Sequence, residues 1–114
     1  MTHDAIYDRT LALRLSGSRA DLADDMLAGL IESLPQTVKD IQSFFSEKNT
    51  EAFTQTVHRL HGLACYCGVP GLQQAVAALE RESKKIDSTS VPEKISAFIN
   101  EAEKLLEHIA SRNI

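Results

Sequence analysis

The stretch RADLADDMLAGLIESLPQTVKDIQSFF, residues 19–45, decides the fold, because its apolar residues recur at the three- and four-residue spacing of a helix. They are Leu22, Met26, Leu30, Leu34, Val38, Ile41 and Phe45. Ser18, with Asp21 three residues later, resembles a capping box at the start of this helix. Pro35 removes one backbone donor, yet the apolar stripe continues in phase beyond it. We therefore expect one long helix from about Arg19 to Phe45, with a kink at Pro35.

Turn-forming residues separate this helix from four others. The breaks fall at Ser16–Ser18, Ser46–Thr50, Gly68–Gly71 and Asp87–Pro92. A short helix over Asp4–Arg14 precedes the long one, and three longer helices follow it. Their expected buried residues are Phe53, Val57, Leu60, Ala64 and Cys67, then Leu72, Val76, Leu79 and Ile86, then Ile95, Phe98, Ala102, Leu105 and Ile109.

The ends of these helices carry typical capping residues. Asn49 or Thr50 caps the third helix, and Gly68 is a natural C-terminal stop for it. Pro70 suits the first turn of the fourth helix. The last helix begins with the capping-box pattern SVPE, residues 90–93. Because short loops join long helices, the sequence predicts an all-α fold in one domain over residues 1–114: an antiparallel up-down four-helix bundle with a short additional N-terminal helix.

Composition and charge narrow the classes of function. Apolar residues make up 43% of the 114 residues and charged residues 25%, as in ordinary soluble proteins. The net charge of −4 offers no basic stripe, so we expect no nucleic-acid partner. No segment approaches the ~18 apolar residues of a membrane span, and the N-terminus lacks a signal-peptide pattern, so we expect no direct membrane contact. Two cysteines cannot build a disulfide framework and fit a reducing cytoplasm.

The stretch VHRLHGLACYCG, residues 57–68, carries the chemically distinctive residues. On a helical wheel His58 points roughly 145° away from the centre of the apolar stripe, and Gly62, one turn later, lies almost opposite the core. An exposed glycine costs a helix about 1 kcal/mol relative to alanine. We interpret Gly62 as clearance that lets another protein approach the imidazole of His58.

An exposed imidazole with a free ring nitrogen is a competent nucleophile near neutral pH, because its ordinary pKa is about 6.5. The sequence contains no Walker-type loop, no Gly-rich nucleotide loop and no clustered acidic metal site that would complete a reaction alone. His58 and Gly62 together therefore indicate chemistry that is carried out with a partner.

The run His58-Arg59-Leu60-His61-Gly62, followed by Gly68, resembles the H-x-L-(K/H)-G-x5-G signature of histidine-containing phosphotransfer (Hpt) domains. With GVPGLQQ downstream and ALRLSGSRADLADDMLAGLIESLP upstream, nearly the whole chain looks like the C-terminal Hpt domain of BarA/GacS-type hybrid sensor kinases. The resemblance implies a phosphocarrier of a two-component multistep phosphorelay, not an autonomous enzyme. His58 would accept a phosphoryl group from an aspartyl phosphate on a receiver domain of a hybrid sensor kinase and pass it to the aspartate of a response regulator.

The same resemblance implies a cytoplasmic domain that binds no cofactor itself, because the partner receiver domain supplies an acidic pocket and Mg²⁺. Positioning and charge stabilisation carry most of the catalysis in phosphoryl transfer, so the helix needs only an exposed, well-oriented imidazole and nearby positive charge. We expect the isolated domain to be a monomer.

The neighbours of His58 also follow from the resemblance. In similar domains a Gln or Glu twenty-two positions after the active histidine hydrogen-bonds its other ring nitrogen, and Glu80 holds that position here. Lys84, one turn beyond Glu80, is placed to meet the phosphate. Arg59 and His61 are the nearest cationic side chains in sequence, although many relatives carry lysine at position 61, which is charged at any physiological pH, unlike an ordinary imidazole. The expected partner surface consists of Gln55, Gly62, Cys65 and Gln73.

Two alternatives remain open. His58, His61 and Cys65 follow the spacing i, i+3, i+7 and would line three metal ligands along one helix, with His3 or His108 as a fourth. A structural zinc site, however, normally takes ligand pairs from two elements. The second alternative is a non-catalytic helical interaction domain, which leaves Gly62 without an explanation.

Overall fold

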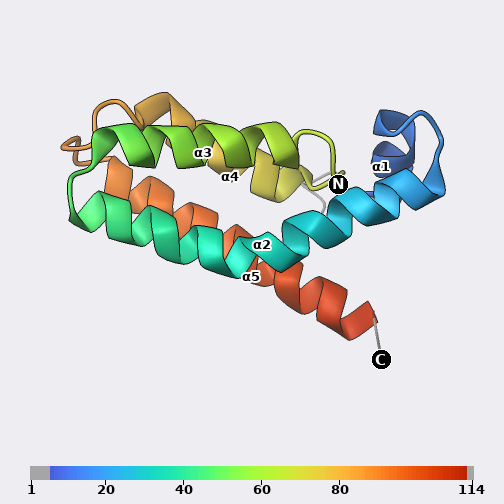
Figure 1. The fold of residues 1–114 in the computed structure, drawn as a ribbon. Coiled ribbons are helices and arrows are strands. Elements are labelled where there is room, and N and C mark those ends of the chain that lie inside the picture. Colours follow the sequence, from blue (N-terminus) through green and yellow to red (C-terminus); the bar gives the residue numbers. More distant parts are fainter. Residues whose placement is uncertain (1–5, 113–114) are drawn as a thin grey trace.

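The computed structural model describes residues 6–112, which form five α-helices and no strand. The helices are α1 (Arg9–Leu15), α2 (Ala20–Ser46), α3 (Thr50–Ala64), α4 (Pro70–Glu82) and α5 (Val91–Arg112). Each of the four long helices packs against the next along the chain, and α5 also contacts α2. Figure 1 shows these four helices as a bundle, with α1 beside the N-terminal end of α2. The predicted all-α bundle with a short N-terminal helix is confirmed.

The centre of the bundle is built from the residues that the apolar stripes predicted. The residues confirmed as buried are Leu30, Leu34, Ile41, Phe53, Val57, Leu60, Ala64, Cys67, Leu72, Val76, Leu79, Ile86, Ile95, Phe98, Ala102 and Leu105. Burial of these large apolar side chains is the main favourable contribution to folding. Ile109 is only partly buried against the core. No helix within residues 6–112 has the length and apolar character needed to cross a membrane.

The long helix α2 runs without a break through Pro35, as predicted. Figure 1 shows α2 changing direction near its middle, the bend expected where a proline removes one backbone hydrogen bond. The predicted capping box at its start is wrong: Arg19 is the N-cap, and no side chain caps the helix. Gly17 and Ser18 both have positive φ, of 68° and 67°, because the chain reverses sharply between α1 and α2.

The buried face of the first turns of α2 also differs from the prediction. Leu22 is 36% exposed, whereas its neighbour Ala23 and then Leu27 are buried. Met26, Val38 and Phe45 are partly buried against the core. Helix α1 packs on this end of α2 and buries its own Ala12, so the small side chain of Ala23 faces inward in place of Leu22.

Helix α1 is shorter than the predicted Asp4–Arg14, and residues 1–5 lie outside the described part of the chain. Asp8 caps it by accepting a hydrogen bond from the backbone N–H of Leu11 at 3.0 Å. The N–H of Asp8 in turn donates to the carbonyl of Gly68 at 2.8 Å. Gly68 has φ +70°, and a Cβ there would lie 2.7 Å from the Asp8 carbonyl oxygen. Only glycine therefore lets α1 close against the α3–α4 connection.

Helices α3 and α4 end earlier than the sequence suggested. α3 stops at Ala64 with Cys65 as its C-cap, so Gly68 follows a further turn instead of ending the helix directly. Cys67 lies in that turn but is still buried, and burial raises the pKa of its thiol to about 11. α4 stops at Glu82, so Ile86 is buried from the connection to α5 and not from the helix.

Candidate functional site

His58 projects from the middle of α3 into solvent. Asn49 starts this helix by accepting a hydrogen bond from the N–H of Ala52 at 3.2 Å. Phe53 and Val57 are completely buried, and they fix the rotation of α3 about its axis. The opposite face must then point outward, and the side chain of His58 is 77% exposed. The direction predicted for His58 from the helical wheel is confirmed.

Glu80 on α4 contacts both histidines of α3. One carboxylate oxygen, Oε2, lies 2.5 Å from Nδ1 of His58, and the other, Oε1, lies 2.6 Å from Nδ1 of His61. Because an ionised carboxylate only accepts hydrogen bonds, each Nδ1 carries a hydrogen and donates it. In the neutral rings the lone pair is then on Nε2. The structure thus brings Glu80 to the ring nitrogen of His58 that the resemblance assigned to it.

This contact depends on the antiparallel register of α3 and α4. Thr54 Oγ1 donates to the carbonyl of Ser83 at 3.4 Å on one side of Glu80, and Gln73 Nε2 lies 3.6 Å from the Cys65 sulfur on the other. Two long buried faces hold that register. The position of Glu80 is therefore set by the core of the bundle.

Glu80, His58 and His61 differ in how far they are buried and in their charge. The side chains of Glu80 and His61 are 26% and 29% exposed, far less than that of His58. The hydrogen bond from His58 lowers the pKa of the Glu80 carboxyl most, the bond from His61 lowers it further, and partial burial opposes both. Glu80 therefore remains an anion throughout the neutral range.

The depressed pKa of Glu80 predicts a pH dependence of stability. The folded state binds fewer protons than the unfolded state around the ordinary pKa of 4.5. Stability from this carboxylate is therefore present above that value and is lost as the pH falls through the lower folded pKa. Urea unfolding of wild type and Glu80→Gln between about pH 6 and pH 3 should show a smaller loss for the variant. If both proteins lose the same free energy of unfolding over this pH range, Glu80 does not have the lowered pKa assigned to it.

The remaining predicted site residues are distributed around His58. At 100° per residue, Gln55, Gly62 and Arg59 lie on one flank of His58, while His61 and Cys65 lie on the flank that faces α4. Gln55 and Arg59 are exposed. Gln73 pairs with Cys65, as described above. Lys84 does not lie on a further turn of the Glu80 helix, because α4 ends at Glu82 and Lys84 is an exposed residue beyond its C-cap. Its contact with the phosphate stays a prediction.

Gly62 leaves the flank of His58 away from α4 open. It is an exposed residue inside α3, and a Cβ built on it meets no atom within 4 Å. No packing or backbone requirement in the fold thus demands glycine here, because φ at this residue is helical. This flank of His58 is therefore unobstructed by the chain itself.

Sequence reasoning missed the bond between His61 and Glu80. The available signal was that His58 and His61 are three residues apart, so that one side chain of α4 can contact both.

Within residues 6–112, no group of three His, Cys, Asp or Glu side chains is arranged to hold a metal ion. Cys65 pairs with Gln73, His108 lies on α5, and His3 is outside the described residues. The geometry therefore offers no support for the metal-binding alternative.

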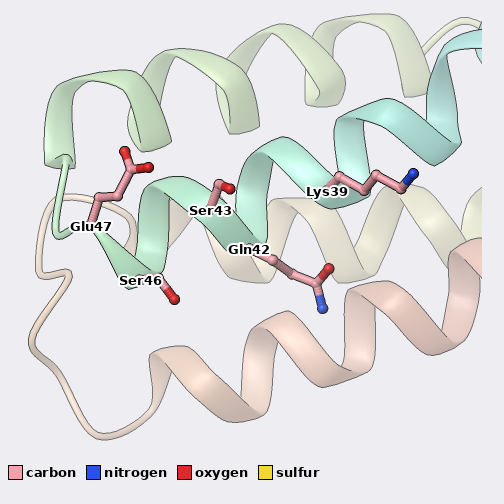
Figure 2. Close-up of a pocket in the computed structure, with 5 residues that line it drawn as sticks. All are labelled: Lys39, Gln42, Ser43, Ser46 and Glu47. Atoms are coloured by element: carbon pink, nitrogen blue, oxygen red, sulfur yellow. The ribbon is translucent and has the colours of Figure 1, made fainter.

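The surface of α2 carries an open hollow that is unrelated to these residues. It is lined by Lys39, Gln42, Ser43, Ser46 and Glu47. Figure 2 shows these five side chains pointing in different directions along α2 instead of converging on one point. Such a polar hollow lacks the convergent groups of a ligand site.

Comparison with known proteins gives consistent matches. The Hpt domain family model matches residues 25–112. The sensor histidine kinase GacS of Pseudomonas protegens is 40% identical over 83 residues, which are 73% of this chain and 9% of that protein. The signal transduction histidine-protein kinase BarA of Escherichia coli is 33% identical over 79 residues, 69% of this chain and again 9% of the relative. The chain thus spans less than a tenth of the length of these curated relatives.

The fold has a close counterpart among solved structures. A crystal structure of the Hpt domain from a sensor hybrid histidine kinase of Shewanella superposes with a TM-score of 0.83. The two chains are 29% identical, and the match covers 93% of this chain and 92% of the other.

Proposed function

The chain belongs to the Hpt domain family, and we propose that it is a phosphocarrier of a two-component phosphorelay in which His58 holds the phosphoryl group. The observation that carries the proposal is the arrangement of His58. Its side chain is exposed, its Nδ1–H is bound by Glu80, which leaves the lone pair on Nε2, and the neighbouring flank at Gly62 is open.

The transfer step needs only groups that this geometry and a phosphorylated receiver provide. The lone pair of Nε2 attacks the phosphorus of an aspartyl phosphate, an N–P bond forms, and the P–O bond to the aspartate breaks. The aspartate leaves with the bonding electron pair as a carboxylate. No proton has to leave the attacking nitrogen, because the ring hydrogen is on Nδ1. Positive charge that develops on the ring lies beside the Glu80 carboxylate, which stabilises it. The reverse step passes the group to a second aspartate.

The proposed partners are receiver domains, one from a hybrid sensor kinase and one from a response regulator. The receiver would contribute the acidic pocket and its Mg²⁺, while this chain contributes the nucleophile and the exposed cation of Arg59. On this proposal the domain is not an autonomous enzyme and acts as a monomer in the cytoplasm. The similarity of the chain to short regions of GacS and BarA supports its place in a phosphorelay.

Incubation with a phosphorylated receiver domain tests the proposal. We expect the chain to gain one phosphoryl group whose bond is labile in acid and stable in alkali, the behaviour of a phosphohistidine. The label should then pass to an unphosphorylated receiver on mixing. If profiling against all receivers of the organism transfers no label, the phosphocarrier function is wrong. Stoichiometric zinc that survives dialysis and raises the melting temperature would instead favour the metal-binding alternative.

A further inference from the structure

His61 stands at the position where many Hpt domains have lysine, but its neutral ring is not suited to the same task. A lysine ammonium donates three hydrogen bonds and can meet a phosphoryl oxygen directly. His61 already donates its Nδ1–H to Glu80 at 2.6 Å. In the neutral ring Nε2 then carries a lone pair, which repels phosphoryl oxygens and does not bind them.

The bond from His61 restrains the Glu80 carboxylate. A glutamate side chain rotates about several bonds, and a single hydrogen bond to one oxygen leaves its terminal group poorly defined. With His61 on Oε1 and His58 on Oε2, both oxygens are fixed and the plane of the carboxylate is set. His61 and Glu80 are both largely shielded from solvent, whereas His58 is exposed, so the restraint lies behind the reacting ring.

We propose that His61 is a positioning residue, whose Nδ1–H holds one oxygen of Glu80 so that the other holds the Nδ1–H tautomer of His58. The proposal rests on His58 being the phosphoryl acceptor. It assigns His61 an action on the nucleophile through Glu80 and not a contact with the phosphate. The Nε2 lone pair of His58 is then available at every encounter with a receiver, without a tautomer change beforehand.

Two amide variants distinguish the two ring nitrogens of His61. The side-chain N–H of asparagine lies near the position of Nδ1, and that of glutamine lies near the position of Nε2. His61→Asn therefore retains a donor toward Glu80, His61→Gln moves the donor outward, and His61→Leu removes it. His108→Asn on α5 is the matched control for replacing a helical histidine by asparagine. Far-UV circular dichroism melts verify that each variant is folded.

The primary measurement is the ¹⁵N spectrum of the His58 ring at neutral pH, which reports the tautomer without any phosphate. We expect wild type, His61→Asn and His108→Asn to hold His58 predominantly as Nδ1–H, and His61→Leu and His61→Gln to shift it toward Nε2–H. Phosphotransfer should slow about fivefold in His61→Leu, the effect of losing one hydrogen bond of average strength, and recover in His61→Asn.

A His58 tautomer that is unchanged in His61→Leu would overturn the proposal. Recovery of transfer by His61→Gln but not by His61→Asn would also overturn it, because the active nitrogen of His61 would then be Nε2. If wild type accepts no phosphate, the phosphocarrier function fails, while the ring spectra still decide whether His61 positions Glu80.

Discussion

Replacing His58 by glutamine is expected to abolish phosphorylation of the chain by a phosphorylated receiver. The lone pair of an amide nitrogen is delocalised into the carbonyl group, so glutamine offers no nucleophile in place of Nε2. The rate should fall by more than about a thousandfold, the size of loss seen when an enzyme loses its catalytic nucleophile. The domain should still fold, with a loss of about 1 kcal/mol in the free energy of unfolding, because the exposed side chain of His58 contributes its hydrogen bond to Glu80 and little packing. Radiolabel transfer and urea unfolding measure the two effects.

His108→Gln is the matched control, since it removes a histidine from another helix, α5, by the same substitution. It should accept phosphate at the wild-type rate. Retained labelling in His58→Gln, with the acid lability of a phosphohistidine, would show that another histidine is the acceptor. Loss of labelling in both variants would point to a general effect of the substitution and not to a role of His58.

The fold was predictable from sequence because most of its stabilising contacts are apolar and periodic. The stripes through Phe53, Leu72 and Phe98 select the buried face of each helix regardless of its exact ends. The ends were less predictable, because capping residues have local alternatives. Ser18 has the side chain of an N-cap, yet the reversal after α1 holds it at positive φ and leaves Arg19 as the cap. Leu22 satisfies the periodicity but loses its place in the core to Ala23, since α1 occupies that side.

The site was predictable to the extent that it lies on one helix. The spacing of His58 and Gly62 within α3 determines that both face outward, and no other element is needed for that conclusion. The link between His61 and Glu80 joins two helices, so it depends on the register of α3 against α4, which packing of the core decides. Lys84 illustrates the same limit, because its position depends on where α4 ends.

Gly62→Gln is expected to stabilise the domain while it slows phosphotransfer. Within a helix glutamine is favoured over glycine by about 0.5 kcal/mol, and a Cβ at position 62 meets no atom within 4 Å. The added side chain occupies the open flank of His58, where the receiver must bring its aspartyl phosphate to Nε2. A displacement of ~1 Å between reacting atoms costs on the order of a hundredfold in rate, and we expect a loss of that size. Stopped-flow kinetics measure the loss in transfer rate, and urea unfolding measures the gain in stability.

Gly29→Gln gives this experiment its internal standard. Gly29 is also an exposed glycine inside a helix, α2, and a Cβ there likewise meets nothing within 4 Å. Gly29 lies in the N-terminal half of α2, near Met26, whose carbonyl oxygen accepts a hydrogen bond from Cys67 Sγ. This part of the bundle is displaced along its long axis from His58. The same substitution should therefore give the same gain in stability with transfer unchanged. If both variants slow transfer equally, the effect comes from a general stiffening of the helices. Gly62 would then not be clearance for a partner. If only Gly62→Gln slows it, the helix tolerates a destabilising residue because a second protein must occupy the space beside His58.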